Sequence, residues 1–155
     1  GTFRWNHLFS DKLFSNTSLI YSHYNYKINI EAANFDIASK IEDLTLKQDL
    51  DYFMNSNNTL KFGGGVIYHM FDPGKISSTV ENGVLNNTKI EDRYSFESAL
   101  YVSNEQKIGS LLTLTYGLRY SNFTQIGPGE IYEYDDDGDV SDTTNYDRFE
   151  KVSKL

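Results

Sequence analysis

The residues of this sequence whose types could do chemistry are concentrated in one acidic segment, residues 130–142. The segment reads EIYEYDDDGDVSD and contains no basic residue. Its carboxylates at alternate positions resemble part of a calcium-binding loop, but an EF-hand loop beginning at Glu133 needs a bidentate glutamate where Thr144 stands. We therefore interpret the segment as the solvated tip of a hairpin that turns at residues 136–139, with Gly138 in a left-handed conformation. Calcium binding remains the alternative.

The three histidines, His7, His23 and His69, are the next candidates for chemistry. They are widely spaced and form no HxH or HxxxH cluster, and the chain has no cysteine. A zinc site needs three or four convergent ligands, so we expect structural or polar-facing histidines, no metal and no cofactor. No GxSxG motif marks a catalytic serine, and we expect no enzyme. If the chain is a hydrolase, His69 near Asp72 is the best candidate for its base.

The glycine run at residues 63–65 could suggest a phosphate-binding loop. It lacks the lysine and the serine or threonine of a P-loop, and it lies inside an expected strand rather than before a helix. We expect instead a strand that a neighbouring backbone or the contents of a barrel approach closely.

Composition limits the class of protein that can position these residues. The 155 residues carry a net charge of −8, which argues against nucleic acid as a partner because phosphate binding needs a basic face. No apolar run approaches the roughly twenty residues of a membrane-spanning helix. Aromatic residues make up 15% of the chain and it has only 2 prolines, a composition typical of β-structure.

Five long segments alternate between apolar and polar side chains, which predicts strands with one apolar and one polar face. They follow a partial strand at residues 3–7 and cover residues 14–31, 36–54, 59–71, 93–104 and 111–123. Each is about twice the usual length of roughly five or six residues. Residues expected on the apolar face are Ile20, Tyr24, Tyr26, Ile28, Ile30, Leu44, Leu46, Leu112, Leu114 and Leu118. Residues expected on the polar face include Lys61, Glu97, Thr115 and Arg119.

The connections between these segments alternate in length. Short ones are expected at residues 8–12, 55–58 and 105–110, and long polar loops at residues 72–92 and 124–147. Short turns at one end of a meander and long loops at the other are typical of outer-membrane barrels. The fold class predicted is all-β, an antiparallel up-and-down meander of long strands, excerpted from such a barrel and truncated at both ends.

Four stretches carry a resemblance to a known family. They are RWNHLFSDKLFSNTSLIYSHYNYKI, DLTLKQDLDYFMNSNNTLKFGGGVIYHMFDPG, ESALYVSNEQKIGSLLTLTYGLRYSNF and GEIYEYDDDGDVSDTT. Together they resemble the barrel of TonB-dependent outer-membrane receptors. The resemblance implies a parent barrel of about 22 strands filled by a plug domain, which the chain in hand is expected to lack.

The family resemblance implies a function in the cell outer membrane. Such receptors bind a scarce nutrient, such as a siderophore, a cobalamin or a glycan, and an inner-membrane energy-coupling complex drives its uptake. The partners implied are therefore outer-membrane lipid, that complex and an unidentified nutrient. The acidity of the two long loops suits a cationic or polyhydroxyl ligand. The candidate ligand-binding residues are Tyr132, Tyr134, Asp135, Asp137 and Asp139.

Two other hypotheses remain open beside the receptor. One is a complete barrel of about eight strands that binds an apolar ligand in its interior. The other is a barrel-borne hydrolase. A sheet excised from a receptor would leave unpaired edges and an apolar face in water, so we expect the isolated chain to associate with itself.

Overall fold

The computed structural model describes residues 1–30, 35–78, 88–89 and 91–152, and these residues form strands and no helix. The protein is all-β, as the sequence predicts. In the described part of the chain, no helix is long and apolar enough to cross a membrane.

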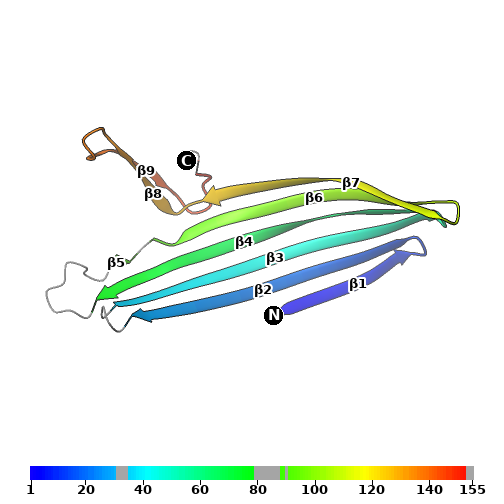
Figure 1. Ribbon diagram of the computed structural model, residues 1–155, viewed down its shortest axis with the longest axis horizontal. Coiled ribbons are helices and arrows are strands. Elements are labelled where there is room, and N and C mark those ends of the chain that lie inside the picture. The colour runs from blue at the N-terminus through cyan, green and yellow to red at the C-terminus, as the bar shows by residue number, and fades with distance from the viewer. Residues whose placement is uncertain (31–34, 79–87, 90, 153–155) are drawn as a thin grey trace. The chain divides into compact units, whose positions relative to one another are not determined.

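The strands of the main sheet follow one another in chain order as an antiparallel meander (Figure 1). The sheet order is β1-β2-β3-β4-β6-β7, and the short strand β5 pairs with β4. The bounds are β1 Thr2–Ser10, β2 Leu13–Ile30, β3 Phe35–Asn55, β4 Asn58–Ser78, β5 Thr88–Lys89, β6 Arg93–Ile108 and β7 Leu112–Ile126. A separate two-stranded sheet pairs β8 (Gly129–Tyr134) with β9 (Val140–Tyr146).

Two predicted loops are wrong in part. The strand β4 continues to Ser78, so residues 72–78 of the first expected loop, residues 72–92, are strand. Two residues of β4, Lys75 and Ile76, pair with β5. Residues 79–87 and 90 of this expected loop lie outside the described part of the chain. The strand passes its Pro-Gly pair because Gly74 adopts a φ of 91° and the Ser39 hydroxyl donates a 2.9 Å hydrogen bond to the Asp72 carbonyl. The loop expected at residues 124–147 instead contains the β8–β9 hairpin. The sequence also predicts a partial strand after the last long one, but among the described residues the main sheet order ends at β7.

The chain divides into two compact units. Unit 1 comprises Gly1–Ser22, Leu44–Tyr68 and Glu97–Phe123, and unit 2 comprises His23–Asp43, His69–Phe96 and Thr124–Leu155. The turns between β1 and β2, β3 and β4, and β6 and β7 belong to unit 1. The hairpin β8–β9 belongs to unit 2.

Unit 1 is sheet with two different faces. One face, here called the apolar face, has a depression lined by Leu46, Val66, Leu100 and Tyr120. The other side, here called the polar face, has a depression lined by residues that alternate with these, namely Lys47, Ile67, Glu97, Tyr101 and Arg119. Leu100, Leu118 and Tyr120 are 66%, 80% and 68% exposed, so no layer of described residues covers the apolar face. The predicted alternation is confirmed for β3, β4, β6 and β7 in this unit.

The prediction for the first part of β2 is wrong by one residue. Gln48 lines the apolar face and hydrogen-bonds to the hydroxyl groups of Thr17 and Ser15. Thr17 is also the cross-strand partner of Trp5 on β1. The odd-numbered residues of β2 therefore share the apolar face in unit 1, and Ile20 takes the opposite side. A one-residue change of register exchanges every side chain between faces.

Unit 2 contains the buried apolar side chains found among the described residues. Ile126, Tyr146 and Val152 are each less than one-tenth exposed. The chain beyond β9 returns beside the end of β7, where the Val152 amide donates a 3.0 Å hydrogen bond to the Gln125 carbonyl. This small core supports the base of the β8–β9 hairpin.

Candidate functional site

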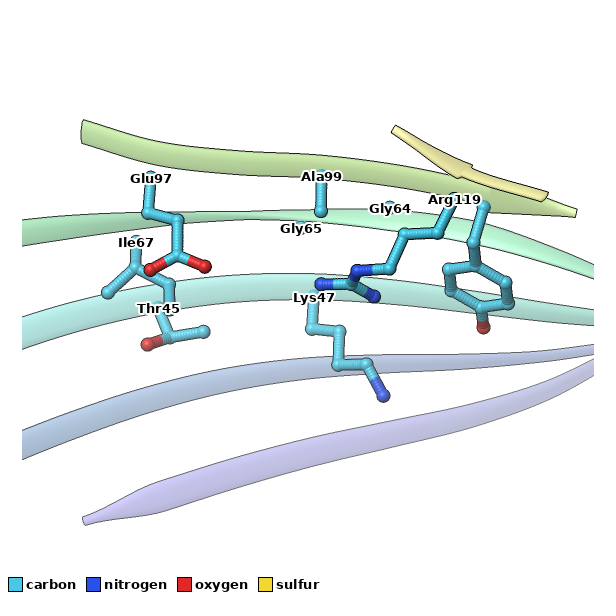
Figure 2. A pocket seen from close by; sticks show the side chains of 9 residues that line it. Thr45, Lys47, Gly64, Gly65, Ile67, Glu97, Ala99 and Arg119 are labelled. Atoms are coloured by element: carbon cyan, nitrogen blue, oxygen red, sulfur yellow. The ribbon is translucent and has the colours of Figure 1, made fainter. Parts of the chain in front are cut away.

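The polar face of unit 1 gathers charges of both signs. Figure 2 shows Lys47, Glu97 and Arg119, from β3, β6 and β7, among the side chains that line one depression. Lys47 Nζ lies 2.9 Å from Asp49 Oδ2, and the Arg119 Nε–H donates a 3.2 Å hydrogen bond to the Ser121 hydroxyl. The cavity measures about 110 Å³, which is small for an organic ligand. Mixed charge of this kind suits a surface that water wets.

The same face contains a hydrogen bond that crosses a strand. The Tyr101 hydroxyl on β6 donates a 2.5 Å hydrogen bond to Asp49 Oδ1 on β3, and β4 lies between these strands. A Cβ added at Gly63 on β4 would lie 2.9 Å from the Tyr101 hydroxyl. The glycine run is therefore a place of close approach, as predicted.

One polar cluster interrupts the apolar face of unit 1. The Thr17 hydroxyl donates a 2.6 Å hydrogen bond to Gln48 Oε1, and Gln48 Nε2 donates one of 2.7 Å to the Ser15 hydroxyl. Ser15 is 3% exposed. The Gln48 amide thus meets its hydrogen-bonding needs inside the chain, which allows a glutamine among leucines.

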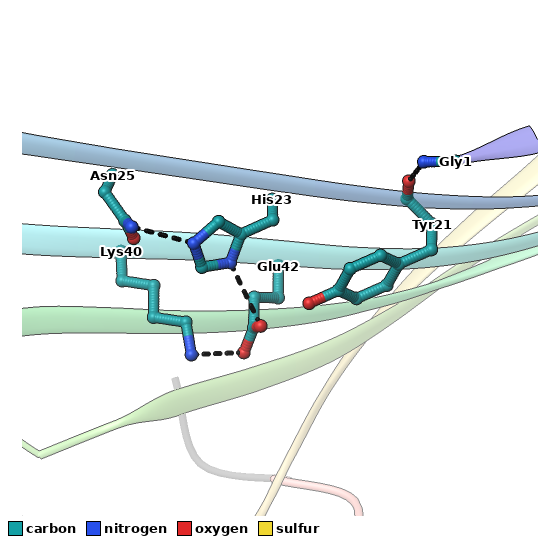
Figure 3. A network of polar contacts seen from close by, with 6 residues as sticks. All are labelled: Gly1, Tyr21, His23, Asn25, Lys40 and Glu42. Carbon is teal, nitrogen blue, oxygen red and sulfur yellow. Dashed lines mark hydrogen bonds and ion pairs between the residues drawn. The ribbon is translucent and has the colours of Figure 1, made fainter.

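In unit 2, His23 belongs to a chain of polar contacts (Figure 3). Its Nδ1 lies 3.1 Å from Glu42 Oε1 and its Nε2 lies 2.7 Å from Asn25 Nδ2, while Lys40 Nζ lies 2.7 Å from Glu42 Oε2. Both ring nitrogens are engaged by neighbours from β2 and β3. This geometry agrees with a structural role for His23.

His69 does not pair with Asp72, the partner considered for a hydrolase. Its Nδ1 lies 2.8 Å from Asp43 Oδ1 on β3, and Asp72 Oδ1 accepts a 2.8 Å hydrogen bond from the Gly74 amide instead. The His69–Asp43 pair is about three-tenths exposed on each side. Strand pairing, which the spacing along the chain does not reveal, selects this partner.

The candidate ligand residues of the acidic segment separate into two groups. Asp135 Oδ1 accepts hydrogen bonds from the amides of Asp137 and Asp139, at 3.1 and 2.9 Å, so this carboxylate closes the hairpin turn. Gly138 has a φ of 88°, which confirms the predicted turn conformation. Asp137, Asp139 and Tyr134 are exposed.

The surroundings of Tyr132 change the acidity of its phenol. Its hydroxyl donates a short hydrogen bond to Glu130 Oε2. This hydrogen bond, together with the negative charge of Glu130, raises the pKa of Tyr132 above its ordinary value. The pair keeps the phenol neutral and holds the Glu130 carboxylate at the base of the hairpin.

A larger cavity lies at that base, within unit 2, and is here called the hairpin-base pocket. It measures about 420 Å³ and is lined by Glu91, Asp92, Tyr94, Pro128, Gly129, Glu130, Asn145 and Tyr146. Spacing along the chain does not reveal this group of residues, because they come from three separate segments. Of the features of the sequence, the acidic segment lies closest to this pocket, through its first residue, Glu130.

No metal centre is assembled in the part of the chain that the structure describes. No three His, Cys, Asp or Glu side chains converge there as metal ligands, so the described acids of the hairpin turn form no calcium cage. The Asp135 carboxylate is instead engaged by backbone amides.

Comparison with known proteins gives no match. No family model matches the chain, and no curated protein or solved structure is significantly similar to it.

Proposed function

We propose that this chain is part of the wall of an outer-membrane barrel, in a receptor of the TonB-dependent class that takes up a scarce nutrient. The observation that carries the proposal is the bare apolar face of unit 1. Leu100, Leu118 and Tyr120 are 66%, 80% and 68% exposed. A large apolar side chain left in water forgoes roughly 1.5–3 kcal/mol of burial energy, so a folded sheet needs something to cover this face.

Hydrocarbon is the cover that fits the strands best. A strand needs only about 9–11 residues to cross a bilayer, and β2, β3, β4, β6 and β7 have 18, 21, 21, 16 and 15 residues. A strand in a membrane barrel alternates apolar residues toward lipid with polar residues toward the lumen. In unit 1 the polar face carries Lys47, Glu97 and Arg119, which suits a lumen.

The aromatic residues of β1 support the same assignment. On the apolar face, Trp5 and His7 have ring centroids 5.4 Å apart, and those of His7 and Phe9 are 4.5 Å apart. Trp5 and Phe9 are more than half exposed. Amphipathic aromatic rings concentrate where a membrane meets water.

The proposed activity is binding and uptake rather than catalysis. In the parent protein, further strands would pair with β1 and β7, the ends of the sheet order. In the isolated chain, the same edges and the apolar face lead us to expect self-association.

Trp5 is the only tryptophan, so its fluorescence tests the proposal without mutation. The chain is folded into vesicles that contain lipids brominated on their acyl chains. We expect these lipids to quench Trp5, and aqueous iodide to quench it weakly. Quenching by iodide alone would show that water covers the apolar face and would contradict the proposal.

A pair of cysteine variants supplies the matched control, because the chain has no cysteine of its own. Leu118→Cys and Arg119→Cys place the thiol on adjacent residues with opposite faces. A fluorophore on Cys at position 118 should be quenched by the brominated lipids, and one at position 119 should not. Equal quenching at both positions would mean that the two faces meet the same solvent.

A further inference from the structure

The main sheet has an open edge at each end of its strand order. Among the described residues, β1 and β7 each pair with one neighbouring strand, β2 and β6 respectively. All nine residues of β1 and the first twelve of β7 are exposed. Hydrocarbon contains no water to satisfy the N–H and C=O groups of such an edge, so a sheet in a bilayer needs a partner strand at both edges.

A second copy of the chain offers the edge that each open edge requires. The six strands of the meander alternate in direction, so β1 and β7 run antiparallel to each other. The strand β1 of one copy therefore pairs with β7 of another while both copies keep the same orientation across the membrane. Pairing of β1 with β1 of another copy would either reverse one copy end to end or exchange its apolar and polar faces.

The apolar faces of the two edges continue each other in this arrangement. Trp5 and Phe9 on β1 are more than half exposed, and Leu118 on β7 is 80% exposed. With both copies in the same orientation, these side chains lie on one side of the joined sheet. Aromatic and aliphatic side chains opposite one another on neighbouring strands stabilise a sheet.

The backbone groups match in the same arrangement. The Gly1 amino group and the Tyr21 amide exchange hydrogen bonds with each other's carbonyls, so odd-numbered residues of β1 direct their backbone groups toward β2 and even-numbered ones, such as Asn6, toward the open edge. On β7, the Gln125 carbonyl accepts a hydrogen bond from the Val152 amide, so odd-numbered residues direct theirs toward the open edge. Both sets lie on the polar face, so the ladder and the faces are satisfied together.

The charges of the polar face exclude one register. Arg4 alternates with Trp5 along β1 and therefore lies on the polar face, where Arg119 of β7 also lies. Like charges directly opposite each other on neighbouring strands are destabilising. The register that places Arg4 opposite Arg119 is therefore disfavoured, and the next register that preserves the faces is two residues away.

The far end of β7 decides the direction of that shift. Ile126 already forms a bridge with Lys151, so this end of the open edge is occupied. The strand β1 of a second copy therefore lies toward the beginning of β7, next to the turn between β6 and β7. A shift of two residues in this direction places Asn6 opposite Thr115.

We propose that copies of this chain close a barrel head to tail, with β1 of each copy paired antiparallel to β7 of the next and Asn6 opposite Thr115. Two, three or four copies would give 12, 18 or 24 strands, even numbers within the range of about 8 to 26 in outer-membrane barrels. Closure removes every open edge, whereas an open row of copies keeps two. This inference rests on the proposed function, since hydrocarbon is what requires all apolar faces to point outward.

Cross-linking between two single-cysteine chains tests the pairing, because the chain has no cysteine of its own. One chain carries Asn6→Cys and the other carries Thr115→Cys, and the two are folded together in detergent micelles and treated with a short bismaleimide. We expect linked dimers from the mixture and none from either variant alone. Linkage of Asn6→Cys with itself would show pairing of β1 with β1, and absence of linkage in the mixture would exclude the β1–β7 contact; either result would overturn the proposal.

Ser121→Cys supplies the matched control for Thr115→Cys. It lies on the same face of β7, six residues further along, which is roughly 20 Å at about 3.3 Å per residue. It should not link to Asn6→Cys. Equal linkage at positions 115 and 121 would indicate unspecific aggregation and would overturn the proposed register.

The mass of the assembly tests closure. For the full chain in detergent micelles, we expect native mass spectrometry to give one oligomer whose mass does not grow with protein concentration. A monomer, or a series of masses that grows with concentration, would overturn the closed ring. The lipid test is separate: quenching of Trp5 by brominated lipids without cross-linking would refute the pairing of copies and leave the proposed receptor wall standing. Cross-linking without lipid contact at Trp5 would refute the membrane assignment instead.

Discussion

Tyr101 on β6 reaches Asp49 on β3 across Gly63, a residue of the intervening strand that has no side chain. The hydrogen bond measures 2.5 Å, and a Cβ at Gly63 would lie 2.9 Å from the Tyr101 hydroxyl and 2.3 Å from the Gln48 carbonyl oxygen. Glycine inside a strand usually weakens it, but here its small size permits a contact between strands that are not neighbours.

Gly63→Ala should therefore destabilise unit 1. The methyl group would force the Tyr101 ring and the backbone at Gln48 to move, and overpacking of this kind costs about 1–3 kcal/mol. Unfolding by urea in detergent micelles, followed by Trp5 fluorescence, measures the change. Gly65→Ala is the matched control, since its Cβ would lie 3.2 Å from the nearest atom. Equal losses of stability in the two variants would contradict this account.

A charge on the apolar face should be costly in a bilayer. Leu118→Lys should lower the free energy of unfolding from lipid by up to about 2–4 kcal/mol, with the largest loss if residue 118 lies at the midplane. Thr115→Lys adds the same charge to the polar face of the same strand and should have a much smaller effect. A similar cost for both would show that no hydrocarbon contacts Leu118.

The hairpin turn should depend on one carboxylate. Asp135→Ala removes the acceptor of two amide hydrogen bonds, from Asp137 and Asp139, and should destabilise the hairpin by about 1 kcal/mol. Faster amide hydrogen exchange in β8 and β9 would reveal the loss. Asp136→Ala makes the same chemical change at a neighbouring exposed position and should leave exchange nearly unaltered; if it does not, net charge rather than hydrogen bonding stabilises the turn.

The stability of the hairpin should depend on pH through Tyr132. Its pKa is raised from the ordinary 10.0, so its hydrogen bond to Glu130 stabilises the hairpin fully below pH 10. That contribution disappears as the pH rises through the raised pKa, because the deprotonated phenol no longer donates. Titration of the Tyr132 ring carbon by NMR should give a lower pKa in Glu130→Gln. Glu133→Gln, the same charge change without this hydrogen bond, should lower it less.

Several features of the fold follow from local patterns alone. Alternation with a period of two depends only on the backbone geometry of a strand, so it predicts the two faces at Leu46, Lys47, Leu118 and Arg119 whatever the strand pairing. The turn at Gly138 was equally local, because a positive φ suits glycine. The nutrient, the membrane and the receptor family remain predictions from the same patterns and from resemblance.

The partners of individual side chains depended on how the strands pair. Spacing along the chain suggested Asp72 for His69, whereas pairing of β3 with β4 brings Asp43 to it. Ile20 lies on the opposite face from the one predicted, because the pairing of β2 with its neighbours places the odd-numbered residues of this strand on the apolar face. A shift of one residue is enough to exchange the two faces. The hairpin-base pocket joins Glu91, Glu130 and Tyr146, which lie far apart in the chain. Such contacts are set by long-range packing, which no local periodicity encodes.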